Sequence, residues 1–523
     1  MKDNDIPPAR TASLVSTAED TAQAGTASTG RTPAASAGPS IALPPTEPAP
    51  TAPAPTAPPA SAPPSAAAPA SAPPATTTTR ATTTRASTTR ATTTTTARTP
   101  QQTCPDCGEP VPADARFVVW CAACGWNTDP EGPKPLKGRL QIRAKRSADR
   151  RGDRLHADLA AHAGAGVAAP SLDAAGIAAH VLAWLVHLTT VVVAVTGVLL
   201  VVLGFPVLTQ VLPGLVLLLL AAAIRPRFPR LPRHAVTLER ADAPRLFALL
   251  DSVASAAGTR TADKVVIDAG FNASVTAYGI RHRRLLTLGL PLWHVLTPQQ
   301  RVAVLGHEFG HYANGDMRRG MVVGTALNTL AGWYVLLLPA ARLRRGALEA
   351  VARALMTVPR GAVLALLRLL DRCTLHTARR AEYRADAVAA RTASTEAMVE
   401  VLDALLGGDS VMHELRRQGI LARTRNRGAD PRAIADGLWA HLAEHARTVP
   451  GHEWERLRRV DERRGHRVRA THPPRYLRRD LLAKAPPEPG TVWLDAAEVA
   501  AIDAELAVLE PTLAKDTLRD LHL

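Results

Sequence analysis

The stretch from Ala174 to Ile224 constrains the fold most, because it contains no Asp, Glu, Lys or Arg. At about 1.5 Å per helical residue, it is long enough for two crossings of a roughly 30 Å hydrocarbon layer. Gly204-Phe205-Pro206 provides the turn between the crossings. Basic residues flank both sides, which predicts that both ends face the cytoplasm. We expect two transmembrane helices within residues 173–225; the density of Val and Leu disfavours the alternative, a buried hairpin of a soluble domain.

A helix around His307 carries the first candidate chemistry. Thr297 is a good N-cap, Pro298 occupies the first helical position, and Gln300 can complete a capping box. The helix is expected to end at Asn314-Gly315. Its flanks are apolar and contain small residues, which predicts that it is buried.

The motif His307-Glu308-x-x-His311 lies inside this helix. Its spacing places both imidazoles on one helical face, where they can bind a single metal ion. Glu308 is placed to take a proton from a water molecule at that metal. Buried histidines that flank a glutamate need a partner, which favours a Zn²⁺ site over a chance pair on a solvated helix.

A catalytic zinc site needs a third protein ligand, and a helix from Thr374 to Arg391 offers one. Glu382 and Asp386 lie one turn apart and share one face of this helix. Glu382 can therefore reach the metal, while Asp386 hydrogen-bonds a ligating imidazole. Acidic pairs on helices are usually solvated, so the spacing alone does not identify a metal ligand. The assignment of Glu382 depends on the need for a third ligand.

Residues 236–480 resemble the HtpX-like and CAAX-prenyl-endopeptidase family of integral-membrane zinc metallopeptidases. The resemblance rests on the two metal-binding motifs, on Gly315-Asp316, on Asn272-Ala273-Ser274 and on Thr471-His472-Pro473-Pro474-Arg475. It implies a zincin-type peptidase domain in which Asp316, like Asp386, supports the metal ligands.

The same resemblance implies further roles. Asn272, Ala273 and Ser274 would belong to the edge strand that binds substrate, and His472 and Arg475 would line the site and stabilise the developing oxyanion. Without the resemblance, the last two would be part of a Pro-rich turn in a basic surface segment.

Together these residues predict a zinc endopeptidase. His307, His311 and Glu382 would hold Zn²⁺ with water at the fourth position, and Glu308 would pass the proton of that water to the leaving amine. An edge strand beside the metal implies an extended or unfolded polypeptide as substrate. The residues do not separate a quality-control protease for membrane proteins from one that processes prenylated proteins.

Four of the five cysteines form two C-x-x-C pairs, each followed by glycine: Cys104, Cys107, Cys121 and Cys124. This pattern supplies four thiolates for one structural Zn²⁺ and predicts a zinc ribbon at residues 101–130. Because so small a module buries little apolar surface, the metal would provide most of its folding free energy. The sequence does not indicate what the ribbon binds.

The net charge of +16 suits anionic lipid headgroups as well as nucleic acid. The basic linker at residues 131–172 adjoins the apolar stretch, so we expect it to contact membrane lipid and expect no nucleic-acid partner. Residues 1–100 are rich in Ala, Pro, Thr and Ser, which predicts a disordered tail. The N-terminus lacks the apolar region of a cleavable secretion signal.

An amphipathic helix is expected at residues 238–257, followed by strands at 264–267, 272–279 and 284–288. Two more apolar stretches, residues 320–341 and 350–370, separate the metal-binding motifs. Ligands on both sides of one metal require an even number of crossings, so either both stretches span the membrane or neither does. Arg360 favours a partly embedded hairpin.

The expected architecture is mainly α, of the α+β class: an N-terminal zinc ribbon, a transmembrane helical hairpin, and a metallopeptidase domain with a small edge sheet. Residues 481–523 would form a C-terminal helical extension. The protein would be multi-pass in the plasma membrane, with its catalytic domain and N-terminus in the cytoplasm. The alternative is a membrane-anchored zinc-ribbon scaffold without proteolytic activity, whose zinc site a fourth protein ligand would close.

Overall fold

The structure is a computed structural model. It describes the ranges 101–132, 138–162, 174–226, 235–279, 281–338, 347–424, 435–467 and 470–521, and also the single residues 229 and 231. The predicted disordered tail at residues 1–100 lies outside the described residues, as do parts of the basic linker. All described residues belong to one structural unit.

The N-terminal module, predicted as a zinc ribbon and called the ribbon below, begins with a two-stranded antiparallel sheet, β1 (Gln101–Thr103) and β2 (Pro110–Pro112). Its core is small and contains Cys104, Val111 and Cys121, with Trp126 packed against them. So few buried side chains leave the thiolate cluster as the centre of this module. Helix α2 (Arg139–Ala161) follows the ribbon.

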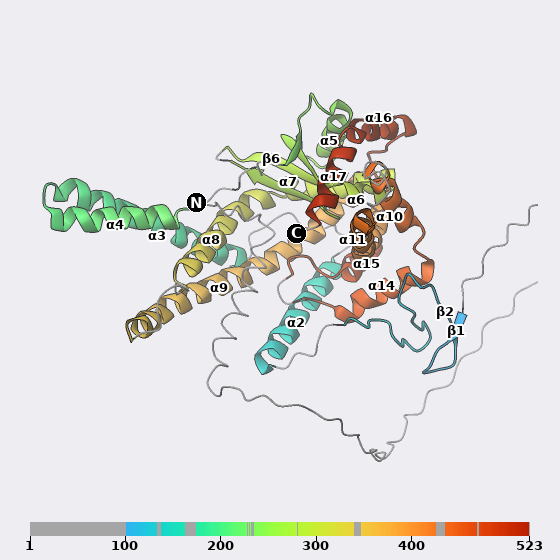
Figure 1. Ribbon diagram of the computed structural model, residues 1–523, viewed down its shortest axis with the longest axis horizontal. Coiled ribbons are helices and arrows are strands. Elements are labelled where there is room, and N and C mark those ends of the chain that lie inside the picture. The colour runs from blue at the N-terminus through green and yellow to red at the C-terminus, as the bar shows by residue number, and fades with distance from the viewer. Residues whose placement is uncertain are drawn as a thin grey trace, which may run out of the picture. The chain divides into compact units, whose positions relative to one another are not determined.

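The charge-free stretch forms two helices, α3 (Ala174–Gly204) and α4 (Leu208–Ile224), that extend from the rest of the unit as an antiparallel pair (Figure 1). They approach closely at Gly197 and Gly214, where an added Cβ on Gly214 would lie 2.9 Å from the Gly197 carbonyl. Small residues allow this approach between apolar helices. Among the described residues, α3 alone is both long and apolar enough to cross a membrane; α4 has 17 residues. The prediction of two spanning helices stays a prediction.

Helices α8 (Asp316–Leu336) and α9 (Ala347–Thr392) pack beside α3. All three contribute to one apolar cluster, with Ala183 from α3, Leu330 from α8 and Leu367 from α9. The sequence predicted a separate helix from Thr374 to Arg391, whereas the structure has one helix of 46 residues with Pro359 inside it. Neither α8 nor α9 meets the length and apolarity of a membrane span.

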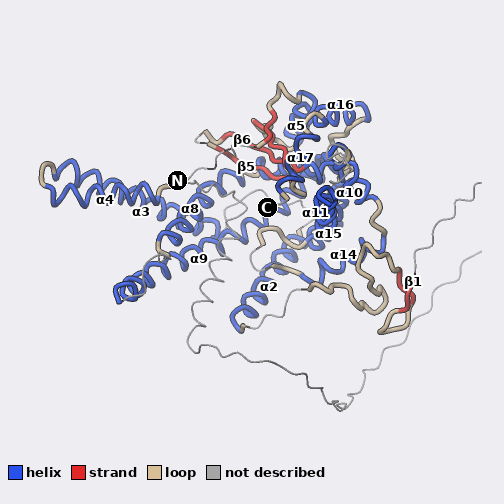
Figure 2. The backbone as a smooth tube through the Cα atoms, in the orientation of Figure 1, coloured by secondary structure: helices blue, strands red, loops and turns tan. Residues whose placement is uncertain are grey.

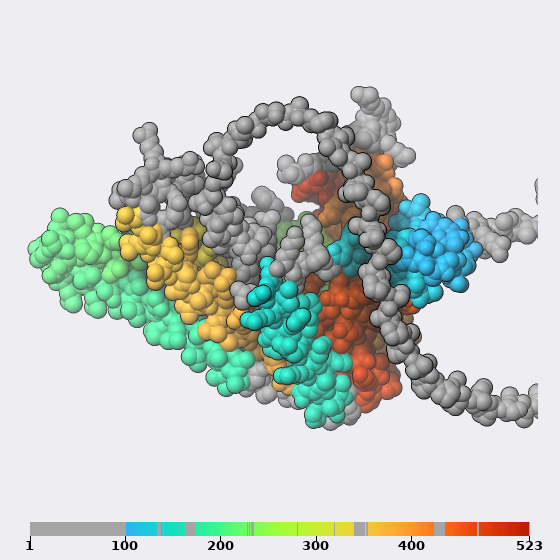
Figure 3. All heavy atoms as spheres, turned by 90° about the horizontal axis from the view of Figure 1, so that it is seen from below, coloured from blue at the N-terminus to red at the C-terminus, as the bar shows by residue number. Residues whose placement is uncertain are grey.

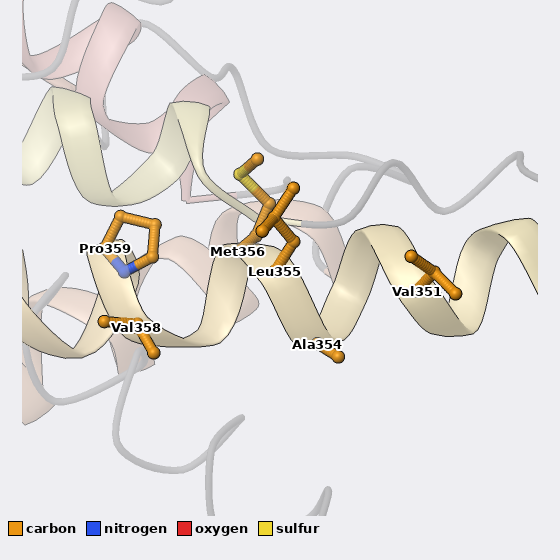
Figure 4. A pocket seen from close by; sticks show the side chains of 6 residues that line it. All are labelled: Val351, Ala354, Leu355, Met356, Val358 and Pro359. Carbon is orange, nitrogen blue, oxygen red and sulfur yellow. The ribbon is translucent and has the colours of Figure 1, made fainter.

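The first part of α9 is exposed and apolar. Figure 4 shows a hollow along this part of the helix, lined by Val351, Ala354, Leu355, Met356, Val358 and Pro359. It contains none of the predicted metal-binding side chains; Glu382, the one of them that α9 carries, lies in the C-terminal part of this helix.

A four-stranded sheet precedes the helix of the H-E-x-x-H motif. Its strands are β3 (Val236–Leu238), β4 (Lys264–Asp268), β5 (Ala273–Tyr278) and β6 (Arg283–Gly289), in the spatial order β3-β4-β6-β5. Strands β4 and β6 are parallel, and the other pairs are antiparallel. The three predicted strands are present, and β5 lies at an edge, as Figure 2 shows in red.

The predicted helix at residues 238–257 is shorter than expected. Leu238 ends β3, and α5 (Pro244–Ala256) begins with Pro244, whose ring suits the first helical turn. The predicted helix began too early, because its first residue, Leu238, belongs to β3, which pairs with β4.

One hydrophobic core joins the sheet to most of the remaining helices. These are α5, α6 (Leu290–Val295), α7 (Pro298–Ala313), α10 (Thr395–Ala404), α11 (Gly408–Thr424), α13 (Leu438–Arg447), α16 (Ala496–Ala507) and α17 (Glu510–Asp520). The predicted C-terminal extension shares this core, because Ile502, Leu506 and Leu513 are buried in it. Helix α15 (Arg475–Lys484) contributes Leu482 to this core, and α14 (Gly451–Arg464) contributes no residue to it within the described structure.

Candidate metal centre

Helix α7 has the ends that its sequence predicts. The Thr297 side chain accepts a hydrogen bond from the Gln300 backbone N–H, and the Gln300 side chain accepts one from the Thr297 N–H. Residues Val302 to Gly310 are all buried. A helix fixed at its start and buried along its length holds His307 and His311 in a defined direction.

Two glycines bring α9 close to this helix. An added Cβ on Gly306 would lie 3.1 Å from the Cα atom of Ala389, and one on Gly310 would lie 2.9 Å from the Cα atom of Ala385. These contacts are between backbones, so a larger side chain would push the helices apart. The small residues of the motif therefore set the distance from which Glu382 reaches the two histidines.

His307, His311 and Glu382 converge in the structure. Their nitrogen and carboxylate oxygen atoms all lie within 4.8 Å of one another. His307 Nε2 is 3.6 Å from Glu382 Oε2, and His311 Nε2 is 3.6 Å from Glu382 Oε1. These separations exceed a hydrogen bond, but they approach the ligand-to-ligand distance of about 3.3 Å expected around a tetrahedral Zn²⁺ with bonds near 2.0 Å.

The other nitrogen of each imidazole is held by a carboxylate. His307 Nδ1 is 3.0 Å from Asp386 Oδ1, and His311 Nδ1 is 3.2 Å from Asp316 Oδ2. Each Nδ1–H can donate to its carboxylate, which leaves the lone pair of Nε2 directed at Glu382 and available to a metal. Asp386 and Asp316 thus each contact one imidazole of the cluster; their supporting roles stay a prediction.

The charges around the ligands favour a cation. The pKa of His311 is raised to about 9: burial lowers it, but the hydrogen bond to Asp316 and the charges of Glu382 and Glu308 outweigh burial. The carboxylates therefore stabilise positive charge at this position, which a divalent metal would supply. The donor set, two imidazoles and one carboxylate, is that of a zinc site with an open position.

Residues 240–484 match peptidase family M48. This part of the chain, just under half of its length, is similar to the M48 peptidases. The family agrees with the resemblance that the sequence motifs indicated, and it identifies a metallopeptidase domain. The metal-binding cluster described above lies inside this M48 domain.

Two relatives match a shorter stretch of the chain. Over 138 residues, the chain is 29% identical to "Protease HtpX" of Pseudomonas putida (strain GB-1) and 30% identical to "Protease HtpX" of Pseudomonas putida (strain W619). Each alignment covers 26% of this chain and 46% of the relative, so the chain spans about half the length of the relatives that it matches. No solved structure matches the chain.

The late motif of the M48 domain brings one of its two predicted residues, His472, to the metal ligands. His472 lies at the site, with Nδ1 2.8 Å from Glu382 Oε2 and its side chain 66% exposed. Arg475 does not contact the ligands in the described structure; it is largely buried, its pKa is lowered by burial, and Asp461 is the first carboxylate among the charges that influence it. The role of Arg475 stays a prediction; Arg478, three residues later, is an arginine that contacts Glu382 and Asp386.

Arg478 lies between the two carboxylates of α9. Its Nε donates to Asp386 Oδ2 at 2.7 Å, and its Nη1 is 3.4 Å from Glu382 Oε2. The pKa of Glu382 is held well below its usual range: burial raises it, but the hydrogen bond from His472 and the charges of His472 and Arg478 prevail. Arg478 shares a face of α15 with the buried Leu481 and Leu482, which is the sequence signal that could have identified it.

Glu308 is buried in α7, beside His307 and His311. Burial raises its pKa, and the charges of His307 and His311 oppose that shift. A carboxylate with a raised pKa binds a proton more readily than one in bulk water. Such a group can accept a proton and then donate it.

The edge strand of the M48 domain lies next to α7. The hydroxyl of Tyr312 donates to the carbonyls of Thr276 in β5 and Leu285 in β6, which ties the strand to the metal-binding helix. Ala273 and Ser274 form the start of β5, and Asn272 precedes it and accepts a hydrogen bond from Gly289 N–H. The three predicted substrate-binding residues thus lie where an edge strand begins.

The second candidate metal site is in the ribbon. The four thiol sulfurs of Cys104, Cys107, Cys121 and Cys124 lie within 4.8 Å of one another. The separations of 3.7 Å for Cys104–Cys124 and 3.6 Å for Cys107–Cys121 are close to the edge of about 3.8 Å expected for tetrahedral thiolates at 2.3 Å from Zn²⁺. These residues fit one structural zinc ion.

Replacing Asp386 with Asn should weaken zinc binding at the M48 site about 10–100-fold, because Asn binds His307 less strongly and does not fix its tautomer. Competition with a fluorescent chelator would measure this affinity. Asp516→Asn, on the exposed face of α17, is the matched control. Equal zinc affinity in both variants would contradict the supporting role of Asp386.

Proposed function

We propose that the chain is a membrane-bound zinc endopeptidase that hydrolyses extended or unfolded polypeptide segments. The observation that carries this proposal is the convergence of His307, His311 and Glu382, with the buried Glu308 beside them. An open zinc site with a neighbouring carboxylate suits hydrolysis, whereas a structural zinc site is closed by a fourth protein ligand.

The proposed chemistry assigns one task to each residue. His307, His311 and Glu382 would hold Zn²⁺, which supplies Lewis-acid activation of water and of the scissile carbonyl. Glu308 takes a proton from the attacking water and delivers it to the leaving amine. His472, at the exposed rim of the site, would donate to the oxygen on which negative charge develops.

The substrate would bind as an added strand. Strand β5 has β6 on one side and lies at the edge of the described sheet, so its other side offers backbone groups to an extended peptide. Pairing of this kind recognises backbone rather than sequence, which suits unfolded segments. We infer that Asn272, Ala273 and Ser274 take part, since they begin this strand.

We propose that the membrane anchors the enzyme through α3 and α4. The outward side chains of this pair are apolar and exposed, including Leu203 at 76% and Leu219 at 72%. Such surfaces are stable in lipid rather than in water. The flanking basic residues support a cytoplasmic site for the catalytic domain.

The proposal is tested by removing and restoring metal. We expect 1,10-phenanthroline to reduce cleavage of an unfolded casein at least about a hundredfold, and stoichiometric Zn²⁺ to restore it, because the proposed hydrolysis depends on a bound Lewis acid. A tightly folded protein should resist cleavage throughout. Undiminished cleavage after the loss of zinc, verified by elemental analysis, would reject the proposal.

A further inference from the structure

The zinc ribbon lies against α14, as Figures 1 and 3 show. The strongest contact joins Arg464 to Asp129, with Nη2 2.7 Å from Oδ1 and Nε 2.9 Å from Oδ2. This is a paired, charge-assisted contact of the kind that fixes geometry as well as binding.

Other arginines of α14 donate to backbone carbonyls of the ribbon. Arg459 Nη1 donates to the Ala122 carbonyl at 2.6 Å, and Arg456 Nη1 donates to the Thr128 carbonyl at 2.9 Å. Ala122 lies between Cys121 and Cys124, so its carbonyl has this direction only when the knuckle is folded. The Arg459 guanidinium also lies 5.1 Å from the ring centre of Trp120, a buried residue of the ribbon.

The ribbon contacts α14 mainly over its C-terminal half, whereas the domain core contacts its N-terminal half. Trp454, near the start of α14, packs on Gly407, and Arg458 is 3.3 Å from Asp403 of α10. The last two turns carry Arg459 and Arg464, whose partners in the described structure include the ribbon atoms given above. Loss of these contacts would loosen the C-terminal end of α14 first.

That end of α14 supports the start of α15. Helix α15 follows Pro474, which provides no side-chain cap for the free N–H groups of the first turn. Asp461 of α14 supplies this function, because its Oδ2 accepts a hydrogen bond from Tyr476 N–H at 2.9 Å. A carboxylate at a helix N-terminus also interacts favourably with the helix dipole.

Helix α15 and the turn before it carry two groups of the metal centre. Arg478 contacts Asp386 and Glu382, and His472 contacts Glu382. Arg379 of α9 binds this turn through the carbonyls of Arg467 and Ala470.

We propose that the zinc ribbon is a positioning element of the metal centre. By binding the C-terminal half of α14, it fixes Asp461, and through Asp461 it fixes α15 with Arg478 and the turn with His472. The effect on turnover rests on the proposed peptidase function, whereas the effect on the order of α15 does not.

The test compares the full chain in lipid nanodiscs with the double variant Arg459→Gln/Arg464→Gln. Zinc content should stay at both sites, because no metal ligand changes. Amide hydrogen exchange in residues 475–484 should become about tenfold faster, since the cap of α15 is loosened. The value of kcat for an unfolded peptide should fall about tenfold, with KM changed less than about twofold, because positioning acts on the transition state.

Matched variants sharpen the comparison. Arg519→Gln, on the exposed surface of α17, should behave as the wild type. Arg459→Lys/Arg464→Lys should recover part of both effects, because Lys keeps the charge without the paired geometry. Should the double variant fail to fold, Asp129→Asn weakens the same contact with a single change in the ribbon and should accelerate exchange in α15.

The results separate the positioning role of the ribbon from the proposed peptidase function. Unchanged exchange in α15 in the double variant and in Asp129→Asn overturns the positioning role, whatever the activity. Faster exchange with unchanged kcat also overturns it, because α15 would then not influence the metal centre. Faster exchange in a chain whose wild type cleaves nothing would support the coupling and reject the proposed peptidase function.

Discussion

Glu308→Gln should reduce peptide cleavage by at least about a thousandfold while both metal sites keep their zinc, because the amide can neither take a proton from water nor deliver one to the leaving amine. The substitution preserves the shape of a buried side chain, so stability should change little. Elemental analysis and cleavage of an unfolded peptide would be measured on the same preparation.

The same variant identifies substrates. Wild type and Glu308→Gln would each be incubated with membrane extract, and new peptide termini compared by mass spectrometry. Termini that arise only with the wild type are products of the metal centre. If Glu308→Gln instead retained most of the wild-type rate with zinc bound, a different group would be the proton carrier, and the assignment of Glu308 would be wrong.

The parts of the fold that sequence predicted are those with local signals. The capping residues Thr297 and Gln300 fix the start of α7, and short runs rich in apolar and β-branched residues indicate β4, β5 and β6. Glu382 was found through chemistry rather than pattern, because a catalytic zinc needs a third ligand. The helix and the strands were predicted from residues close together in the sequence. Glu382 was predicted from the number of protein ligands that a catalytic zinc needs.

The remainder depends on contacts between distant segments. The continuity of α9 was missed because Pro359 disfavours a helix interior by about 3 kcal/mol in isolation, while packing of Leu367 and neighbouring side chains against α3 and α8 outweighs such a preference. Arg478 was missed because the face of α15 that meets α9 is set by tertiary packing. The contacts between the ribbon and α14 have no local signal at all.

Replacing Arg478 with Met should have the largest effect on stability. The side chains of Arg478, Asp386 and Glu382 are exposed by only 6%, 2% and 6%, so the substitution leaves two buried carboxylates without their shared cation. Breaking a buried pair in this way costs about 3–5 kcal/mol of the free energy of unfolding. For a domain of this size, we expect the melting temperature to fall by about 10 °C.

Arg479→Met is the matched control. Arg479 is the next residue along the chain, and its side chain is 31% exposed and pairs with Asp403 at 3.0 Å. A partly exposed pair of this kind is worth about 0–1 kcal/mol, so the melting temperature should hardly change. Bound zinc provides Glu382 with another positive charge, and the loss in Arg478→Met should therefore be smaller with zinc than after its removal. Equal melting temperatures for the two variants, with and without zinc, would show that Arg478 does not compensate the negative charges of Glu382 and Asp386.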